Sequence, residues 1–441
     1  MIEPRVLKGF RDFLPETMIL KKELIKRLES VFESFGFVPI DTPALEYTEI
    51  LLGKGGGETD KQIYRFNDHG GRDIALRYDL TVPLARFVSE HYGELNFPFK
   101  RYHIAPVWRG ENTQKGRYRE FYQCDFDILG SNSVNSDLEI LLTIKEGFKV
   151  LNAGDFRINI NNRKILNSFL KKFDLLERSA DVLRTIDKIY KIGVEEVVKE
   201  LSENLKIGIS YSWDIINILG LDNENKMGFT GDEIFETFEK YKSKLDNEEA
   251  TKNIEEIESI FKTLKEMDLL NYFAYNPAIT RGLDYYTGIV FESFILDRVE
   301  FGSVCSGGRY DNLTGLYSKN VVTGVGASFG LDRLLALMED KNILEKKSTK
   351  TALLIFNLDS NKMAFYNKLA DYFRKNGINT EVIYEKQKIG NQFKFAEKKA
   401  IKYVLIAGEE EIKTEKFNLK NIISGDERKS LSKEEIIQII C

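Results

Sequence analysis

Apolar residues recur at helical spacing near the start of the chain and then give way to strand-like runs. Residues 18–35 place apolar side chains every three or four positions and stop at Gly36, which predicts an amphipathic helix packed on a sheet. Aromatic and β-branched runs then predict strands, connected as antiparallel hairpins, at 37–40, 62–66, 73–78, 102–108 and 120–129. Later runs at 288–296 and 324–329 predict two more strands, and a helix should begin near Leu331. The pattern indicates a large α+β domain.

A different pattern interrupts this domain at residues 163–275. Apolar residues here repeat at three- and four-residue steps, as in Ile165, Phe169 and Phe173, which predicts a helical insertion domain. The segment carries 17 basic and 23 acidic residues, a net charge of −6, so it does not present a generally basic surface. A solvated helical domain without a binding role remains an open interpretation.

The last ninety residues form a third region with its own pattern. A charge-rich linker at 341–350 precedes alternating strand and helix signals at 351–356, 362–375, 380–384, 393–400 and 403–407. This βαβαβ order favours a separate α/β domain with a largely parallel sheet. From residue 349 onward the chain has 17 basic and 13 acidic residues, a net charge of +4.

Composition limits the class of protein. With 441 residues, 42% hydrophobic and 30% charged, the chain is typical of a folded protein of several domains. No run approaches the roughly 18 apolar residues of a membrane span, and the first residues lack a signal-peptide core, so we expect a cytoplasmic protein that does not act at a membrane. Cys124, Cys305 and Cys441 contain no CxxC pair, which indicates neither a disulfide framework nor structural zinc. The net charge of −5 argues against a polyanionic partner, but a chain-wide sum hides local patches.

The strongest local signal for chemistry follows residue 108. Residues 109–119 hold four basic side chains and one acidic one, and alternation along 120–129 places Phe121, Gln123, Asp125 and Asp127 on one face. That face is too polar for a core. Arginines beside an aromatic platform suit a polyphosphate and a base, whereas the alternative is an exposed hairpin with solvated charges.

A glycine-spaced strand at 324–330 leads into a helix whose first turn contains Arg333. A cation at a helix amino terminus opposes the helix dipole, and a bound phosphate would resolve the conflict. The neighbouring Asp332 offers a rival explanation, because its carboxylate alone could satisfy the helix start. The glycines form neither a Walker nor a dinucleotide pattern, so a P-loop enzyme or a Rossmann dehydrogenase is disfavoured.

Two further segments, 281–288 and 305–311, combine arginine, adjacent tyrosines and glycines between strands. They could be ordinary turns or could bind a small polar ligand through tyrosine hydroxyls. Asp79 and Thr81 share a face, where Asp79 could accept a hydrogen bond from an ammonium group or could cap a helix. The three histidines show no metal-ligand spacing and no G-x-S-x-G elbow exists, so zinc and triad hydrolases are disfavoured.

Together these segments resemble the histidyl-tRNA synthetases, a family of class II aminoacyl-tRNA synthetases, over essentially the whole chain. Residues 8–15 resemble the family's opening signature, and the helix and strand that end at Pro43 resemble motif 1, a dimer element. The hairpin after Arg109 resembles motif 2, and 324–335 resembles motif 3. Residues 281–288 and 306–311 are similar to the histidine-specific signatures, and the tail is similar to the anticodon-binding domain.

The resemblance implies residue roles. Arg109 and Arg333 would hold ATP phosphates, with Glu111 and Phe121 on the adenine. The implied histidine-binding residues are Asp79, Thr81 and Gln123 for the amino group, Asp127 and Tyr286 for the imidazole, Tyr285 beside them, and also Arg109 and Arg281. The implied catalytic residues are Arg281, Arg109 and Arg333, with Arg281 acting between the histidine carboxylate and the α-phosphate. The metal ligands are left unassigned.

The resemblance also implies an architecture and a reaction. The expected parts are a six-stranded antiparallel catalytic domain at 1–162 and 276–340, the helical insertion at 163–275, the linker at 341–350, and the anticodon-binding domain at 351–441. The expected homodimer would use ATP, with Mg²⁺, to attach L-histidine to tRNA(His) through a histidyl-adenylate. The alternatives are a non-catalytic, histidine-sensing regulatory subunit of ATP phosphoribosyltransferase, which usually lacks the tail, and a general RNA-binding protein.

Overall fold

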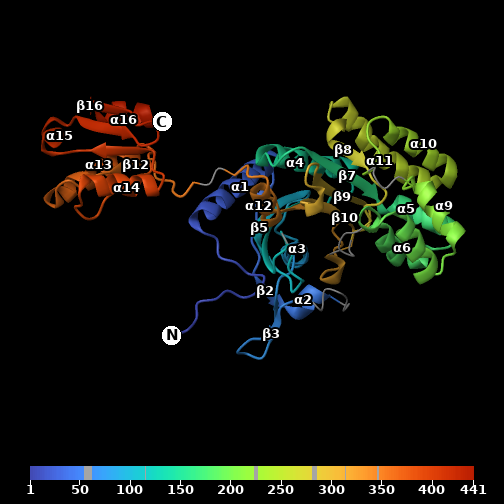
Figure 1. The fold of residues 1–441 in the computed structure, drawn as a ribbon. Coiled ribbons are helices and arrows are strands. Elements are labelled where there is room, and N and C mark those ends of the chain that lie inside the picture. Colours follow the sequence, from blue (N-terminus) through green and yellow to red (C-terminus); the bar gives the residue numbers. More distant parts are fainter. Residues whose placement is uncertain (54–61, 115, 223–226, 281–285, 313, 345–346) are drawn as a thin grey trace. The chain divides into compact units, whose positions relative to one another are not determined.

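The computed structural model describes residues 1–53, 62–114, 116–222, 227–280, 286–312, 314–344 and 347–441 (Figure 1). The chain forms two compact units. The first comprises Met1–Arg11 and Leu24–Ile343, and the second comprises Asp12–Glu23 and Leu344–Cys441. Among the described helices, none has the length and apolar character needed to cross a membrane.

An eight-stranded sheet organises the first unit. Its strands, in spatial order, are β1 (Val38–Pro39), β5 (Phe99–Trp108), β6 (Glu120–Leu129), β11 (Gly324–Gly330), β10 (Cys305–Tyr310), β9 (Ile289–Ile295), β7 (Phe156–Asn162) and β8 (Phe273–Tyr275). The six strands from β5 to β7 pair antiparallel, as expected, whereas β1 and β8 add parallel pairs at the two edges. The expected six-stranded sheet is therefore the centre of a wider one.

One face of this sheet carries the core. Helix α4 (Val134–Leu151) begins at Ser133, whose side chain accepts a hydrogen bond from the Asn135 amide, and its Phe148 packs edge-on against Phe329 of β11 at 5.1 Å between ring centroids. Helix α1 (Pro15–Ser34) ends before Gly36, which adopts a φ of +80°, and its Phe32 stacks on Phe126 of β6 at 4.7 Å. These aromatic side chains alternate with the polar side chains of the same strands, so the other face is left for chemistry.

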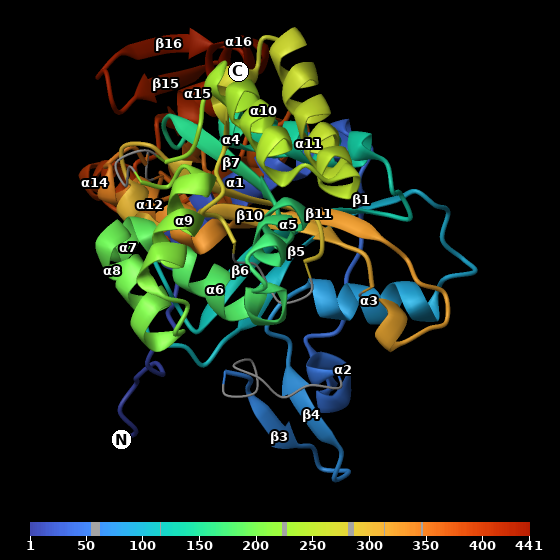
Figure 2. The ribbon, with the colours of Figure 1, turned by 90° about the vertical axis from the view of Figure 1, so that its right-hand side faces the viewer.

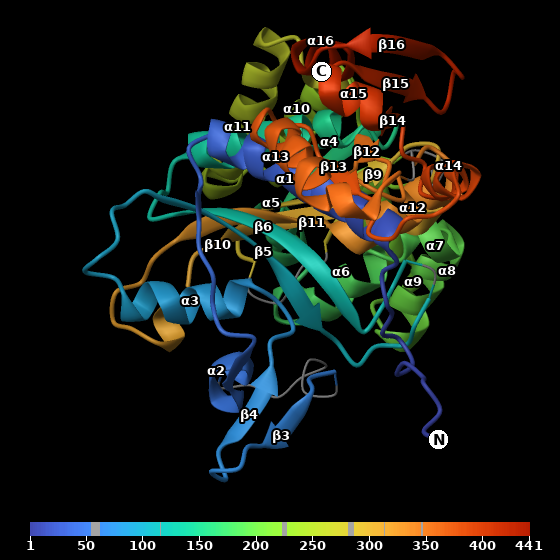
Figure 3. The ribbon, with the colours of Figure 1, turned by 90° about the vertical axis from the view of Figure 1, so that its left-hand side faces the viewer.

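The opposite face is approached by helix α3 (Thr81–Glu90), and Figures 2 and 3 show α4 and α3 on opposite sides of the sheet. A small antiparallel sheet precedes α3 in the chain, with order β2 (Leu45–Tyr47), β4 (Asp73–Leu76) and β3 (Arg65–Asn67). The short helix α2 (Thr48–Leu52) follows β2. The predicted hairpin between 62–66 and 73–78 is this β3–β4 pair, shortened at both strands.

The helical segment between β7 and β8 folds as the sequence indicates. Its α-helices are α5 (Arg163–Lys172), α6 (Ser179–Ile186), α7 (Ile189–Ile192), α8 (Val194–Lys199), α9 (Ile209–Leu219), α10 (Glu233–Leu245) and α11 (Glu248–Glu266). Ile165 and Phe169 are buried, and Phe169 meets Tyr241 of α10 edge-on. The segment returns to the large sheet through β8, which pairs parallel to β7.

The second unit contains a five-stranded sheet. The order is β13 (Thr380–Val382), β12 (Leu353–Ile355), β14 (Tyr403–Ile406), β15 (Phe417–Asn421) and β16 (Glu427–Leu431). The first three strands are parallel, as predicted, but β15 and β16 add an antiparallel half that the sequence pattern did not indicate. The helices are α13 (Met363–Lys375), α14 (Ile389–Lys398), α15 (Glu409–Thr414) and α16 (Lys433–Ile440).

Candidate active site

Arginine and aromatic side chains meet where β5 leaves the sheet. Arg109 Nε donates a hydrogen bond to the Tyr78 carbonyl at 2.9 Å, and its guanidinium carbon lies 5.1 Å from the centre of the Phe121 ring. Glu111 lies between Arg109 and Arg117, with an N–O distance of 3.9 Å to each. The structure thus brings Arg109, Glu111 and Phe121 together at one end of the polar face.

Arg333 reaches the same place from the start of helix α12 (Leu331–Asp340), and its NH1 donates to the Ser303 carbonyl. Burial, and next the charge of Arg117, lowers the pKa of Arg333, so the site brings like charges together. The rival explanation for Arg333 is not supported, because Asp332 is already engaged: it accepts from Arg11 and, at 2.6 Å, from the Tyr122 amide. An anionic ligand would relieve the repulsion between the arginines.

A cavity of about 150 Å³ lies between these groups. Its lining includes Arg109, Glu111, Phe121, Gln123 and Arg333. The residues come from the end of β5, the start of β6 and the first turn of α12, which are more than two hundred positions apart in the sequence. The cavity offers an aromatic ring at its wall and guanidinium groups from two elements, as a nucleotide requires.

Beyond the cavity, the polar face carries buried groups with unused hydrogen-bonding capacity. The buried atoms without a hydrogen-bond partner among the described residues include, on this face, Asp79 Oδ2, Arg101 Nε and NH1, His103 Nδ1, Gln123 Oε1, Asp125 Oδ1, Asp127 Oδ2 and the side-chain amide of Asn159. Buried polar atoms in native proteins are almost always paired, so a cluster of them marks the place where a polar ligand binds.

Asp79 stands at the entrance to α3. Its Oδ1 accepts from the Val82 amide at 3.1 Å, so the helix-cap interpretation is partly correct, while Oδ2 remains available. Burial raises the pKa of Asp79 to about 6, although the nearby Arg109 and Arg101 lower it. Thr81, the first residue of α3, is also buried. A cationic ligand group beside Asp79 would lower this pKa and stabilise the ionised form.

Asp127 is held on several sides. Tyr310 donates its hydroxyl to Asp127 Oδ1 at 2.7 Å, and Arg101 NH2 lies 2.7 Å from Oδ2. A Cβ on Gly326 of β11 would lie 1.9 Å from Oδ1, so glycine is needed where this carboxylate crosses the neighbouring strand. Gln123, on the same face of β6, donates to Ser328 at 3.1 Å.

Tyr286 approaches from the loop before β9. A Cβ on Gly308 would come within 2.9 Å of its ring, and its carbonyl accepts from Arg163 NH1 at 2.9 Å. Arg281 and Tyr285, also predicted to bind histidine, lie outside the described residues. Asn161 donates to the carbonyls of Pro277 and Ile279, so the segment that leads toward residue 281 is anchored to β7.

The sequence interpretation assigned no role to three members of this cluster, Arg101, His103 and Tyr310. The predicted strand began at residue 102, one position too late to include Arg101. Extending the alternation of that strand would have placed Arg101 and His103 opposite Asp127 and Asp125, which are their partners in the β5–β6 register. Tyr310 lies in the signature at 306–311, and alternation along β10 would have indicated that its side chain points to the polar face of the sheet.

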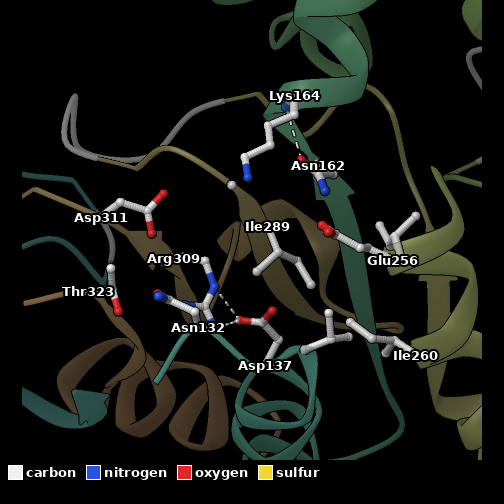
Figure 4. A pocket seen from close by; sticks show the side chains of 13 residues that line it. Asn132, Asp137, Asn162, Lys164, Glu256, Ile260, Ile289, Arg309, Asp311 and Thr323 are labelled. Atoms are coloured by element: carbon white, nitrogen blue, oxygen red, sulfur yellow. Dashed lines mark hydrogen bonds and ion pairs between the residues drawn. The ribbon is translucent and has the colours of Figure 1, made fainter. Parts of the chain in front are cut away.

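A second and larger cavity, of about 220 Å³, lies at the α4 side of the sheet. Figure 4 shows Arg309 of β10 bound to Asp137 of α4, with an Nε–Oδ1 distance of 2.9 Å, and Lys164 beside Asn162. Arg309 alternates with Tyr310 along the strand and so points away from Asp127. Its guanidinium donates to the Asp137 carboxylate, to the Ser131 and Ser133 carbonyls and to the Ser136 hydroxyl, so Arg309 has a structural role.

An antiparallel sheet with a motif 2 hairpin, an arginine at the start of a motif 3 helix and a buried amino-acid-sized polar cluster defines the catalytic domain of a class II aminoacyl-tRNA synthetase. Comparisons with known proteins specify the family. The family model described as Histidyl-tRNA synthetase matches residues 9–334, and the model described as Anticodon binding domain matches residues 352–441. The chain belongs to the histidyl-tRNA synthetase family.

Relatives agree over the full length. The chain is 50% identical to a protein of Treponema denticola named Histidine--tRNA ligase, over 92% of this chain and 89% of that protein. A protein of the same name from Wolinella succinogenes is 45% identical over 100% and 98%. The crystal structure of histidyl-tRNA synthetase from Nostoc sp. superposes with a TM-score of 0.89 at 32% identity, covering 100% of this chain and 99% of that one.

Proposed function

We propose that the chain activates L-histidine with ATP and transfers it to tRNA(His). The observation that carries this proposal is the continuity of two sites on one sheet face: the arginine-lined cavity beside Phe121 and the buried cluster around Asp127. The first suits ATP and the second suits a small, polar, cationic amino acid. Family membership and the matching anticodon-binding segment support the choice of histidine and tRNA as substrates.

For ATP, we assign Arg109 and Arg333 to the phosphates, Phe121 to stacking on the adenine and Glu111 to an adenine contact. The proposal is supported by the shared cavity and by the converging guanidinium groups. ATP enters as its magnesium complex. No cluster of three metal-binding side chains occurs in the part of the chain that the structure describes, so we assign the ion chiefly to the phosphate oxygens.

For histidine, we assign the amino group to Asp79, Thr81 and Gln123, and the two ring nitrogens to Asp127 and Tyr286, with Tyr285 beside them. A site built around buried hydrogen-bonding groups rejects an amino acid that leaves them unpaired, by factors of about 10⁴. Asp79 Oδ2 and Gln123 Oε1, which have no hydrogen-bond partner among the described residues, and the Asp127 carboxylate, whose ion pair with Arg101 leaves lone pairs free, are such groups.

The reaction follows from the juxtaposition. The histidine carboxylate attacks the α-phosphorus of ATP, the bond to pyrophosphate breaks, and histidyl-adenylate forms. Negative charge accumulates on the phosphate oxygens during the attack, and fixed guanidinium groups stabilise it without reorganisation. We assign Arg281 to the carboxylate and α-phosphate, beside Arg109 and Arg333. Holding both reactants on one rigid sheet supplies much of the rate by orientation. The ribose hydroxyl at the tRNA 3′ end then displaces AMP.

The rest of the chain is assigned to tRNA. We propose residues 1–162 and 276–340 as the catalytic domain, 163–275 as an insertion near the acceptor stem, 341–350 as a linker and 351–441 as the anticodon-binding domain. We also propose a homodimer formed through the motif 1 helix and strand, acting in the cytoplasm, where tRNA is charged for translation.

Histidine-dependent exchange of pyrophosphate into ATP by the purified protein tests the function. We expect exchange with L-histidine and none above background with other amino acids. Binding of histidine without exchange would instead favour the regulatory-subunit interpretation. A solved structure titled as a regulatory subunit of ATP phosphoribosyltransferase/histidyl-tRNA synthetase shares the fold with a TM-score of 0.73, but at 21% identity.

The catalytic assignment of Arg281 has its own test. Arg281→Ala should reduce the exchange rate at least a hundredfold at saturating histidine and ATP, because the developing phosphate charge loses a fixed cation, an effect worth about 3 kcal/mol. Thermal unfolding should remain within a few degrees of the wild type. Unchanged exchange would remove Arg281 from the mechanism.

A further inference from the structure

Arg101 is an unusual residue for the middle of a sheet. Its side chain on β5 is 0% exposed. Among the described residues, Asp127 is the one carboxylate that forms an ion pair with its guanidinium. Its Nε and NH1 have no hydrogen-bond acceptor in the same part of the structure. Burying a guanidinium costs several kcal/mol, which a single ion pair barely offsets. A residue retained at such a cost is a candidate for function.

The geometry shows what Arg101 does to Asp127. The β5–β6 register places the two residues directly opposite each other, and the guanidinium lies against Oδ2 while the Tyr310 hydroxyl occupies Oδ1. Gly326 leaves space for Oδ1 on the third strand. Arg101 and Tyr310 together determine the direction in which the carboxylate points its remaining lone pairs.

Electrostatics makes Arg101 more important than Tyr310. Burial raises the pKa of Asp127, and the charge of Arg101 is the largest influence that lowers it again, ahead of the Tyr310 hydrogen bond. Among the described residues, the other charged or titratable groups near this pair include Asp125 on β6, Asp79 before α3, Tyr310 on β10, Tyr286 before β9 and His103 on β5. Burial lowers the pKa of His103 to about 4, so it adds no positive charge at neutral pH.

We propose that Arg101 is a positioning residue that keeps Asp127 ionised and aimed as a hydrogen-bond acceptor for the imidazole N–H, and so sets the selectivity of the pocket for histidine. This inference rests on the assignment of Asp127 to the imidazole in the proposed function. Without the charge of Arg101, the pKa of Asp127 rises further, so more of the carboxyl is protonated at a given pH. A protonated carboxyl presents a donor where the ring N–H needs an acceptor.

The sign of the pH effect separates this role from a structural one. Removing Arg101 raises the pKa of Asp127, and the acceptor form exists only above that pKa. The affinity of the variant for histidine should therefore recover as the pH rises. Expressing each KM relative to the wild type at the same pH cancels the titration of free histidine itself.

The experiment compares Arg101→Gln, Arg101→Lys and the wild type in pyrophosphate exchange at pH 6.5, 7.5 and 8.5. For Arg101→Gln, we expect the KM for histidine to rise at least tenfold at pH 6.5, the ratio to wild type to fall toward pH 8.5, and the KM for ATP to change less than twofold. Arg101→Lys, which retains the charge, should restore most of the affinity and remove the pH dependence.

Arg86→Gln is a matched control. It also removes an arginine from a buried carboxylate, Glu46, at a distance of 2.8 Å, but in a pair on α3 and the small sheet. It should leave the KM for histidine unchanged. If Arg101→Gln does not fold, Arg101→Lys carries the test: we expect a KM for histidine near that of the wild type without pH dependence, and a rise of tenfold or more despite the retained charge overturns the inference.

Other outcomes identify which assumption fails. A pH-independent rise in both KM values for Arg101→Gln makes Arg101 merely structural and overturns the inference. If Asp127→Asn leaves the KM for histidine unchanged, the assignment of Asp127 fails, and the inference with it, while the function stands. Absence of histidine-dependent exchange in the wild type overturns the proposed function itself.

Discussion

Buried carboxyl groups on the polar face of the large sheet make the stability of the protein depend on pH in a direction opposite to that of ordinary surface acids. Burial raises the pKa of Asp125 to about 7, and the neighbouring Asp127 and Asp79 add to the effect while Arg101 opposes it. In the unfolded chain an aspartate titrates near pH 3.9. Between these values the folded protein holds a proton that the unfolded chain has lost, so stability falls as the pH rises.

Asp125→Asn tests whether the ionisation of this carboxyl lowers the stability of the folded protein as the pH rises. The amide cannot ionise, so the ligand-free variant should be more stable than the wild type at pH 8, by on the order of 2 kcal/mol, and close to it at pH 4.5. Urea unfolding at the two pH values measures the difference. A variant that is equally altered at both would show that packing, not ionisation, dominates at this position.

Which residues share a face was predicted correctly from the sequence where the pattern is local. Phe121, Gln123 and Asp127 share a face because strand alternation is a short-range property, and the structure places them as expected. Arg101 and Tyr310 could not be assigned in this way, because their importance comes from Asp127, which is a neighbour only through strand pairing. Likewise, the choice between a cap at the helix and a phosphate contact at residues 332–333 depended on Arg11, more than three hundred positions away.

At the scale of elements, strands β11 and β10 contribute to the site by having glycine at positions where a side chain would not fit. Gly326 and Gly308 occupy positions where a side chain would collide with Asp127 and with the Tyr286 ring, respectively. Both have φ outside the left-handed region, so backbone freedom does not explain them. The glycine-spaced strand that the sequence predicted before Arg333 is β11, and its Gly326 leaves room for the Asp127 carboxylate.

Gly326→Ala follows from that observation. The new methyl group would lie 1.9 Å from Asp127 Oδ1 and must displace the carboxylate, so we expect the KM for histidine to rise at least tenfold while the KM for ATP changes little. Gly93→Ala is the control, since a Cβ there has no atom within 4 Å. Equal effects on both substrates would indicate general disruption of the sheet instead.

The elements themselves were predictable to the extent that their signal is periodic. The long helix α1 and strands β6 and β9 were predicted within three residues of their observed ends. Strand β16 was not predicted, because its exposed, charged positions, such as 427–429, carry no apolar alternation. Strand β15 was also missed, although its Phe417 and Leu419 alternate and are buried, because two apolar positions make too short a signal. The edge strand β8 was assigned to the helical insertion, because three buried residues show no strand period by themselves and pair with β7.

At the scale of the whole molecule, the uneven distribution of charge explains how an acidic protein can bind tRNA. The chain has a net charge of −5, yet residues 352–441 match the anticodon-binding model, and the chain from residue 349 onward has a net charge of +4. Phosphate contacts depend on where the cations lie and are insensitive to the net charge of distant domains, because screening acts over roughly 10 Å.

Removing residues 346–441 tests the division of labour. Adenylate formation needs only the sheet and its helices, whereas charging needs tRNA to be held. We expect kcat/KM for tRNA charging to fall at least a hundredfold, while histidine-dependent pyrophosphate exchange stays within about threefold. The retained exchange also reports that the catalytic domain has folded. Equal loss in both assays would contradict an anticodon-binding role for the tail.

The order of strands in the large sheet has a consequence for synthesis of the protein. The centre of the sheet joins β6 to β11, where Gln123 and Ser328 are separated by 205 positions, and the helical insertion lies between them. At roughly 5 to 20 residues per second, a ribosome needs about 10 to 40 s to make the second strand after the first. Throughout that interval the edge of β6 that later pairs with β11 has unpaired backbone N–H and C=O groups. Such an edge can pair with other chains, so the nascent protein is exposed to aggregation until β11 is made, although the finished sheet is paired there.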